Sequence, residues 1–266
     1  MFGQNIKLVG NIYKMIKFFR KTRQKLLSEN KVSKYLVYAI GEIVLVVIGI
    51  LIALQINNWN ETNKKRSEET ILLEALRQDF IENEKRLTTT MTYQKGMIDY
   101  SNGLISSITG NTIKTIDSDS ILKLKAFGAN SWFRAELVNS TFETIISSGK
   151  GDIIQNLNLK KKLVDFSTDL KSGFEDDYES KECIVFMNNI SFEHEVNFLD
   201  RDDQESFGIT IPKDSIRKSF NSLFSNRSYL GALINKTGIE SSRLDYQKKL
   251  YDQVDEILKE INSEIQ

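Results

Sequence analysis

An uninterrupted apolar run of twenty residues, from Tyr35 to Leu54, constrains this chain more than any other feature of its sequence. The run reads YLVYAIGEIVLVVIGILIAL and contains one charged residue, Glu42. Twenty helical residues at about 1.5 Å each extend about 30 Å, which matches the hydrocarbon core of a bilayer. We therefore expect residues 35–56 to form a single transmembrane helix.

Two other interpretations of the run are a buried helix of a soluble protein and a cleaved signal peptide. Gly41 and Gly49 are unfavourable inside a soluble helix but are common in membrane spans. Tyr35 and Tyr38 lie at one edge of the run and Trp59 just past the other, where aromatic residues meet a membrane surface. No A-x-A cleavage site follows the run, so the sequence favours an uncleaved signal anchor.

Charge is distributed unequally on the two sides of this run. Residues 1–34 contain nine lysines and arginines and one acidic residue, whereas residues 55–266 contain 27 basic and 34 acidic residues. The positive-inside rule then predicts that residues 1–34 are cytoplasmic and that residues 57–266 lie outside the membrane. The acidic C-terminal part has no basic patch, so we expect no nucleic-acid partner for it.

The basic segment also has an amphipathic pattern over residues 15–28. A helix there would lie on the anionic cytoplasmic face of the bilayer. An ordinary basic flank that only sets the topology explains the same charges equally well. On a helical wheel the apolar side carries Met15, Ile16, Phe19, Leu26 and Leu27, and the basic side carries Lys17, Arg20, Lys21 and Lys25.

Glu42 is the candidate functional residue of the span, because a carboxylate near the centre of a bilayer costs roughly 2.5–3.5 kcal/mol. On a helix it shares a face with Tyr38, Gly49 and Ala53, whereas the opposite face is aliphatic. Gly49 and Ala53 form a small-xxx-small pair, which lets another helix approach closely. We expect this stripe to contact a membrane-protein partner or a second copy of the chain. The alternatives are that Glu42 snorkels or is protonated, or that it relays a proton or an ion.

Long helices are expected beyond the span, because the chain has one proline in 266 residues and proline interrupts helices. Over residues 61–108 apolar side chains recur on one helical face, which predicts a long helix that continues directly from the span. Gly110 and Asn111 end it, and residues 117–120 resemble a turn with candidate N-caps. The apolar positions of the long helix are Leu73, Leu76, Phe80, Leu87, Met91 and Ile98.

The same criteria predict further helices in the rest of the chain. One covers about residues 139–148 and is followed by Gly149 as its C′ residue. The next begins near residue 159 and runs past Tyr178, another begins near Pro212, and the last includes residues 250–265. The predicted fold class is therefore all-α, with a single N-terminal transmembrane helix and an antiparallel helical bundle on a membrane stalk.

The run MIKFFRKTRQKLLSENKVSKYLVYAIGEIVLVVIGILIALQINNWNE, from Met15 to Glu61, closely resembles the N-terminus of a bacterial family, domain of unknown function 6090. The resemblance is most specific at residues 57–60, and a looser similarity covers Ser140 to Leu163. It implies a single-pass protein of the bacterial inner membrane with a periplasmic helical domain, and it implies no activity. Since the family begins near Met15, residues 1–14 are expected to be a misassigned start. The expected divisions are residues 1–34, 35–56 and 57–266.

Motifs for catalysis or metal binding are not found in the sequence. It has no phosphate-binding G-x-x-x-x-G-K-[ST] loop and no G-x-S-x-G elbow. A single cysteine and a single histidine leave no basis for a cysteine-rich or multi-histidine metal site. We expect His194 at the surface, Cys183 as a buried inert thiol, and the acidic residues 175–177 and 202–203 on solvated faces. Residues 117–119 begin like a calcium loop but lack its glycine and later ligands.

These observations predict a non-enzymatic membrane protein that presents a helical interaction or sensing module outside the membrane. We expect no catalytic residue, no cofactor and no metal, and the expected partners are the lipid bilayer and a membrane protein. An accessory subunit of an ion-driven or transport complex that uses Glu42 is the alternative. An extracytoplasmic enzyme with an unfamiliar site is a third possibility.

Overall fold

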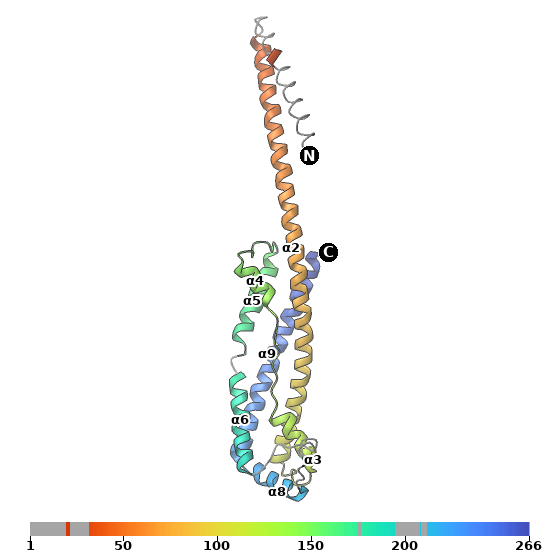
Figure 1. Ribbon diagram of the computed structural model, residues 1–266, viewed down its shortest axis with the longest axis vertical. Coiled ribbons are helices and arrows are strands. Elements are labelled where there is room, and N and C mark those ends of the chain that lie inside the picture. Colours follow the sequence, from red (N-terminus) through yellow and green to blue (C-terminus); the bar gives the residue numbers. More distant parts are fainter. Residues whose placement is uncertain (1–19, 22–31, 175–176, 195–207, 209–211, 266) are drawn as a thin grey trace. The chain divides into compact units, whose positions relative to one another are not determined.

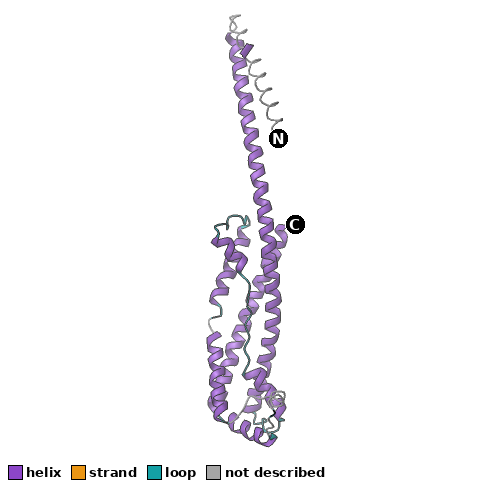
Figure 2. Ribbon diagram, in the orientation of Figure 1, coloured by secondary structure: helices purple, strands orange, loops and turns teal. Residues whose placement is uncertain are grey.

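The computed structural model describes residues 20–21, 32–174, 177–194, 208 and 212–265 (Figure 1). Every regular element among these residues is a helix, which confirms the predicted all-α class (Figure 2). The predicted amphipathic segment 15–28 lies outside the described residues, except for Arg20 and Lys21. The elements are α2 Val32–Thr109, α3 Ser118–Lys123, the π-helix η1 Leu124–Ala129, α4 Ser140–Ser147, α5 Leu157–Ser172, α6 Asp177–Glu193, α8 Lys213–Phe224 and α9 Arg227–Ile265.

Helix α2 has 78 residues and contains both the apolar run and the predicted long helix, so the expected continuation is confirmed. Among the described residues, α2 is the helix that is long and apolar enough to cross a membrane, and the qualifying part begins at Ala39. Its predicted end is also confirmed, because the helix stops at Thr109 and Asn111 adopts a positive φ of 56°. The chain divides into two units, Met1–Ser67 and Glu68–Gln266.

The second unit contains a first hydrophobic core between α2, α4, α5 and α9. The rings of Phe80 on α2 and Phe166 on α5 lie 5.0 Å apart in this core. Arg77 contacts Asn262 and Gln94 contacts Glu240, so α2 and α9 run in opposite directions. Fully buried members of the core are Leu76, Leu87, Leu159, Leu163, Phe166, Leu250, Val254, Ile257 and Ile261.

A second hydrophobic core lies further along α2 and is closed by α3, η1, α6, α8 and the beginning of α9. Figure 1 shows α5 and α6 one after the other along α9, so that each packs against a different part of that helix. The second core therefore has its own set of covering helices. Its most buried members are Leu104, Ile121, Ala129, Met187, Phe220, Leu223, Tyr229 and Leu233.

The prediction that one helix runs from residue 159 past Tyr178 is wrong, because α5 ends at Ser172 and α6 begins at Asp177. The reason lies at Gly173, where a Cβ atom would lie 1.9 Å from the ring of Tyr246. Only glycine allows this close approach, and glycine is also a poor helix former. The predicted N-cap Asp117 of α3 and the predicted start of α8 after Pro212 agree with the structure. The last helix is longer than predicted, because α9 begins at Arg227.

Candidate functional site

The predicted site residues of the span all lie on α2. Gly49 and Ala53 are exposed, and a Cβ atom at Gly49 would meet no described atom within 4 Å. Glu42 is partly exposed, and the side chain of Tyr38 lies outside the described residues. Gly49 and Ala53 are therefore open to another helix on the described surface, and the contact of the stripe with a partner remains a prediction.

A different set of polar residues is buried inside the second unit. Buried positions on α9 follow an alternating spacing of four and three residues, which is the heptad spacing of helices that pack along their length. The four central positions are polar, and each is almost completely buried. In order, the series is Tyr229, Leu233, Lys236, Glu240, Arg243, Gln247, Leu250, Val254, Ile257 and Ile261.

We define the polar layer as these four α9 residues with Gln94 of α2 and Asp177 and Ser180 of α6. At its centre the Nη1 of Arg243 lies 2.7 Å from Oε1 of Glu240. The Nε2 of Gln94 donates to Oε2 of Glu240 at 2.9 Å and to its backbone oxygen at 3.0 Å. The Nε2 of Gln247 in turn donates to Oε1 of Gln94. A buried carboxylate is thus held by a guanidinium and an amide, as the cost of burying a charge requires.

Asp177 extends this network to α6. Its Oδ1 lies 3.4 Å from Nε of Arg243, and its Oδ2 accepts a 2.5 Å bond from Nη1 of Arg134. The Nη2 of Arg243 also donates to Oγ of Ser180 at 3.3 Å. The prediction that Asp177 lies on a solvated face is therefore wrong, because two guanidinium groups draw it into the protein. The neighbouring acidic residues 175–176, and the predicted solvated pair 202–203, lie outside the described residues.

Lys236 forms the other end of the polar layer. Its Nζ donates to the backbone oxygen of Gly128 at 2.6 Å and lies 2.9 Å from Sδ of Met97. Burial lowers the pKa of Lys236 to about 8, against a smaller opposing effect of Glu240. Burial also lowers the pKa of Lys125, one turn before Gly128 on η1, to about 7. Two amines are therefore kept where their charged forms are unfavourable.

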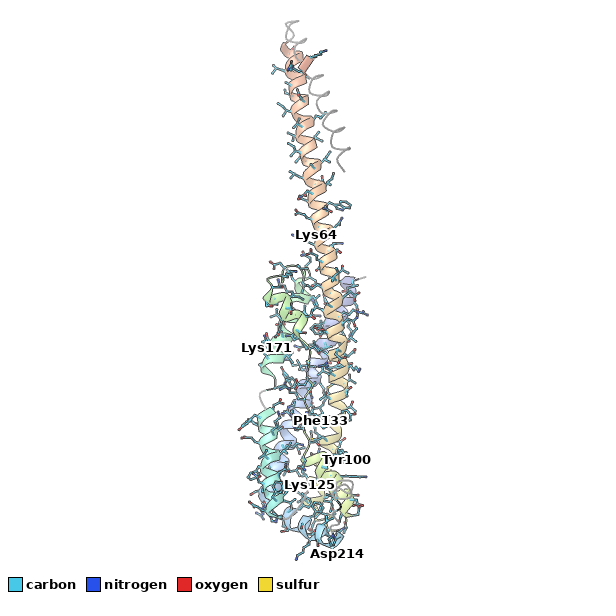
Figure 3. All side chains as sticks on the ribbon, viewed as in Figure 1. Lys64, Tyr100, Lys125, Phe133, Lys171 and Asp214 are labelled. Atoms are coloured by element: carbon cyan, nitrogen blue, oxygen red, sulfur yellow. The ribbon has the colours of Figure 1, made fainter. Side chains whose placement is uncertain are left out.

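Residues 130–139 are not helical, and we call them the extended segment (Figure 3 labels Phe133 within it). This segment was not predicted from the sequence. The amide of Asn83 donates to the backbone oxygen of Val138 at 2.7 Å and accepts from its nitrogen at 2.6 Å. Gln247 accepts from the backbone nitrogen of Ala135, and Nη1 of Arg86 donates to the oxygen of Glu136. Side chains of α2 and α9 thus replace the hydrogen bonds that a sheet would supply.

Two surface grooves lie apart from the polar layer. One of about 660 Å³ lies between α2 and α4, and one of about 940 Å³ lies between α6 and α9. Cys183 lines the second groove and is half-buried, so its prediction as a buried thiol is wrong. The Nδ1 of His194 lies 2.8 Å from Oγ of Ser222, and the side chain is partly buried. In the described part of the chain, no group of three or more metal-ligating side chains is present.

The spacing of residues on α9 is the sequence signal for the polar layer. Between Leu233 and Leu250 the heptad spacing of α9 continues through four polar residues instead of stopping. Charged residues on a predicted helix are ordinarily assigned to its exposed face. An unbroken 4-3 register through charged residues therefore indicates that those residues are buried and must have partners.

Comparison with known proteins identifies one family. The model of a family of unknown function, DUF6090, matches residues 42–170, which confirms the resemblance drawn from the sequence. The matched segment begins at Glu42 and ends within α5, so it includes the extended segment and Gln94. No curated protein and no solved structure matches the chain.

Proposed function

We propose that this chain, whose residues 42–170 match the model of the DUF6090 family, is a single-pass inner-membrane protein that presents a helical interaction or sensing module outside the membrane. The observation that supports this most is the continuity of α2. One helix contains the apolar run and also the module residues Asn83 and Gln94.

The charge distribution supports the orientation of the proposal. The segment of residues 1–34 has a net positive charge and therefore stays in the cytoplasm. Residues 57–266, which have a net negative charge, then form an antiparallel helical bundle on the periplasmic side. The span acts as an uncleaved anchor, and the bilayer is the first partner of the protein.

The chemistry of the polar layer supports a role without catalysis. Its carboxylates at Asp177 and Glu240 are engaged by Arg134 and Arg243, and they are buried rather than placed in a groove. A catalytic acid or base must reach its substrate within hydrogen-bond distance. Carboxylates and guanidinium groups that are paired in the interior in this way are suited to fixing or changing the conformation of the protein.

The second candidate function is an accessory subunit of an ion-driven or transport complex. The observation that favours it is Glu42, the one charged residue inside the apolar run. Intramembrane carboxylates commonly mark ion pathways or partner contacts. In this role Glu42 itself would be essential, whereas in the first role the surrounding small residues matter more.

A membrane two-hybrid assay with the full chain distinguishes the two functions. Gly49→Leu places a large side chain on the stripe, and Val44→Leu, which puts a leucine on the opposite face by adding one carbon, is the control. The proposal predicts that Gly49→Leu abolishes the association of the transmembrane helix with its partner helix, while Glu42→Gln and Val44→Leu retain this association. Association that survives Gly49→Leu contradicts the helix contact.

Affinity purification of the full chain from native membranes gives the complementary result. A stoichiometric membrane partner that is present with wild type and lost with Glu42→Ala would support the accessory-subunit role. Equal recovery of the same partners with both forms would support the module, and the search would move to ligands of residues 57–266.

A further inference from the structure

The polar layer separates the two hydrophobic cores of the second unit. On α9 the first core uses residues 250–261 and the second uses residues 229–233. On α2 the first core includes Leu87 and the second includes Leu104, with Gln94 between them. Both long helices therefore pass from one apolar core to the other through a stretch whose interior contains charged and amide groups beside the apolar Met97 and Ile98.

Such a layer couples the two cores weakly. Apolar side chains that pack continuously along a helix resist separation, because every turn would expose apolar surface to water. Separation at the polar layer instead returns Lys236, Glu240 and Arg243 to water, which solvates their charges and recovers the desolvation cost of burying them. Proteins open locally in cooperative units, and a boundary between units lies where the interior stabilises least.

The extended segment shows on which side of this boundary each part belongs. Asn83, Arg86 and Gln247 hold its backbone from Ala135 to Val138 on the side of the first core. The preceding helix η1 contributes Ala129 to the second core. The bond from Lys236 to the oxygen of Gly128 joins α9 to η1. Two further contacts join the extended segment to the beginning of α6, namely Arg134 with Asp177 and Lys181 over the ring of Trp132.

We infer that the polar layer is a conformational hinge, at which the second core opens as a unit while the first core stays packed. The opening breaks the Lys236–Gly128 bond and releases η1, the part of α6 that carries Met187 and Ile190, α8 and the beginning of α9. The extended segment remains attached to α2 and α9. The hinge goes beyond the proposed function, because it is inferred from the buried contacts of the second unit alone. It requires neither the membrane orientation nor a partner.

The charges around Lys236 are consistent with such a device. Glu240 and Arg243 act on it from α9 and Cys183 from α6, while α2 contributes the neutral Met97. Burial disfavours the charged form of Lys236, so the closed state is less favourable when this amine is protonated.

Hydrogen exchange followed by mass spectrometry of the full chain in detergent micelles at pH 7 tests the hinge. Peptides that contain Met187–Ile190 and Phe220–Leu233 should exchange together and at least tenfold faster than peptides that contain Leu250–Ile261. Lys236→Met should slow the faster group at least threefold. Lys248→Met, an exposed lysine on the same helix, should leave both groups unchanged.

A second variant makes the layer apolar with Gln94→Leu, Lys236→Met, Glu240→Leu and Arg243→Met. It should bring the exchange of the second core close to that of the first. Equal exchange of both cores in the wild type would overturn the hinge. Faster exchange of the second core that Lys236→Met leaves unchanged would also overturn it, and this single variant decides the question even if the fourfold variant does not fold.

Discussion

Replacing Lys236 by methionine offers the sharpest test of how the polar layer affects stability. Methionine is one heavy atom shorter, so its sulfur takes the place of the lysine Cδ and its methyl group that of Cε, and nothing replaces the ammonium group beside Sδ of Met97. The substitution removes a buried charge and leaves a gap of one heavy atom. It also removes the donor to the backbone oxygen of Gly128.

The magnitude follows from these two effects. The pKa of Lys236 falls from 10.5 to about 8, which at about 1.36 kcal/mol for each pH unit is a penalty of roughly 3 kcal/mol on the charged form. The unpaired oxygen of Gly128 costs about 1–3 kcal/mol. We therefore expect Lys236→Met to raise the free energy of unfolding at pH 7 by about 0.5–2 kcal/mol.

The pH dependence has a definite sign. The folded-state pKa of Lys236 lies below its unfolded value, so between about pH 8 and pH 10.5 the unfolded chain binds the proton that the folded chain has lost. The free energy of unfolding of the wild type therefore rises with pH across this window. Lys125, with a folded-state pKa of about 7, extends the same rise to lower pH. In the Lys236→Met variant, the contribution of Lys236 to this rise is absent and the contribution of Lys125 remains.

Urea denaturation of the full chain in detergent, followed by circular dichroism at pH 7 and pH 9.5, measures this difference. Between pH 7 and pH 9.5 the free energy of unfolding of the wild type should increase by about 2 kcal/mol more than that of the variant. This value follows because pH 9.5 lies about 1.5 pH units above the pKa of Lys236, at about 1.36 kcal/mol for each unit. Lys248→Met, on an exposed turn of α9, should behave as wild type. A variant that loses more than about 2 kcal/mol at pH 7 and keeps the full pH dependence would refute the reasoning.

The remaining predictions concern the same unit. Arg243→Met leaves Glu240 buried without its cation and should lower the free energy of unfolding by about 3–5 kcal/mol in urea denaturation; a loss under about 1 kcal/mol would show that the pair is solvated. Gly128→Ala places a Cβ atom 2.7 Å from the backbone nitrogen of Ser101, so the variant should lose about 1–3 kcal/mol through overpacking and melt at lower temperature. Gly231→Ala is the matched control for thermal melting, because its Cβ atom meets no described atom within 4 Å; it should melt at or slightly above the wild-type temperature, and equal losses in both variants would contradict the packing argument.

Regular helices were predictable from the sequence because their determinants are local. The apolar spacing of α2, the cap at Asp117 and the stop after Thr109 each depend on residues within a few turns. The break at Gly173 was missed because its cause is a ring from α9, 73 positions away along the chain. The extended segment was missed for the same reason, since Asn83 and Val138 are 55 residues apart.

The polar layer was partly predictable. The heptad register of α9 passes through Lys236, Glu240 and Arg243, so their burial is encoded in the sequence. Their partners are not, because Gln94 and Asp177 come from helices whose register against α9 is set by both apolar cores together. The proposed contact of the stripe around Glu42 needs a second helix, and residues of one chain do not specify that helix.

Labelling of engineered cysteines in intact cells tests the central claim most directly. In a Cys183→Ser background, single cysteines replace Lys21, Lys64 or Asp214, all of which are exposed (Lys64 and Asp214 are labelled in Figure 3). A membrane-impermeant maleimide should label positions 64 and 214 in cells with a permeable outer membrane, and position 21 only after the inner membrane is disrupted. Labelling of position 21 in intact cells, or protection of position 214 until disruption, would contradict a module held outside the membrane by a single span.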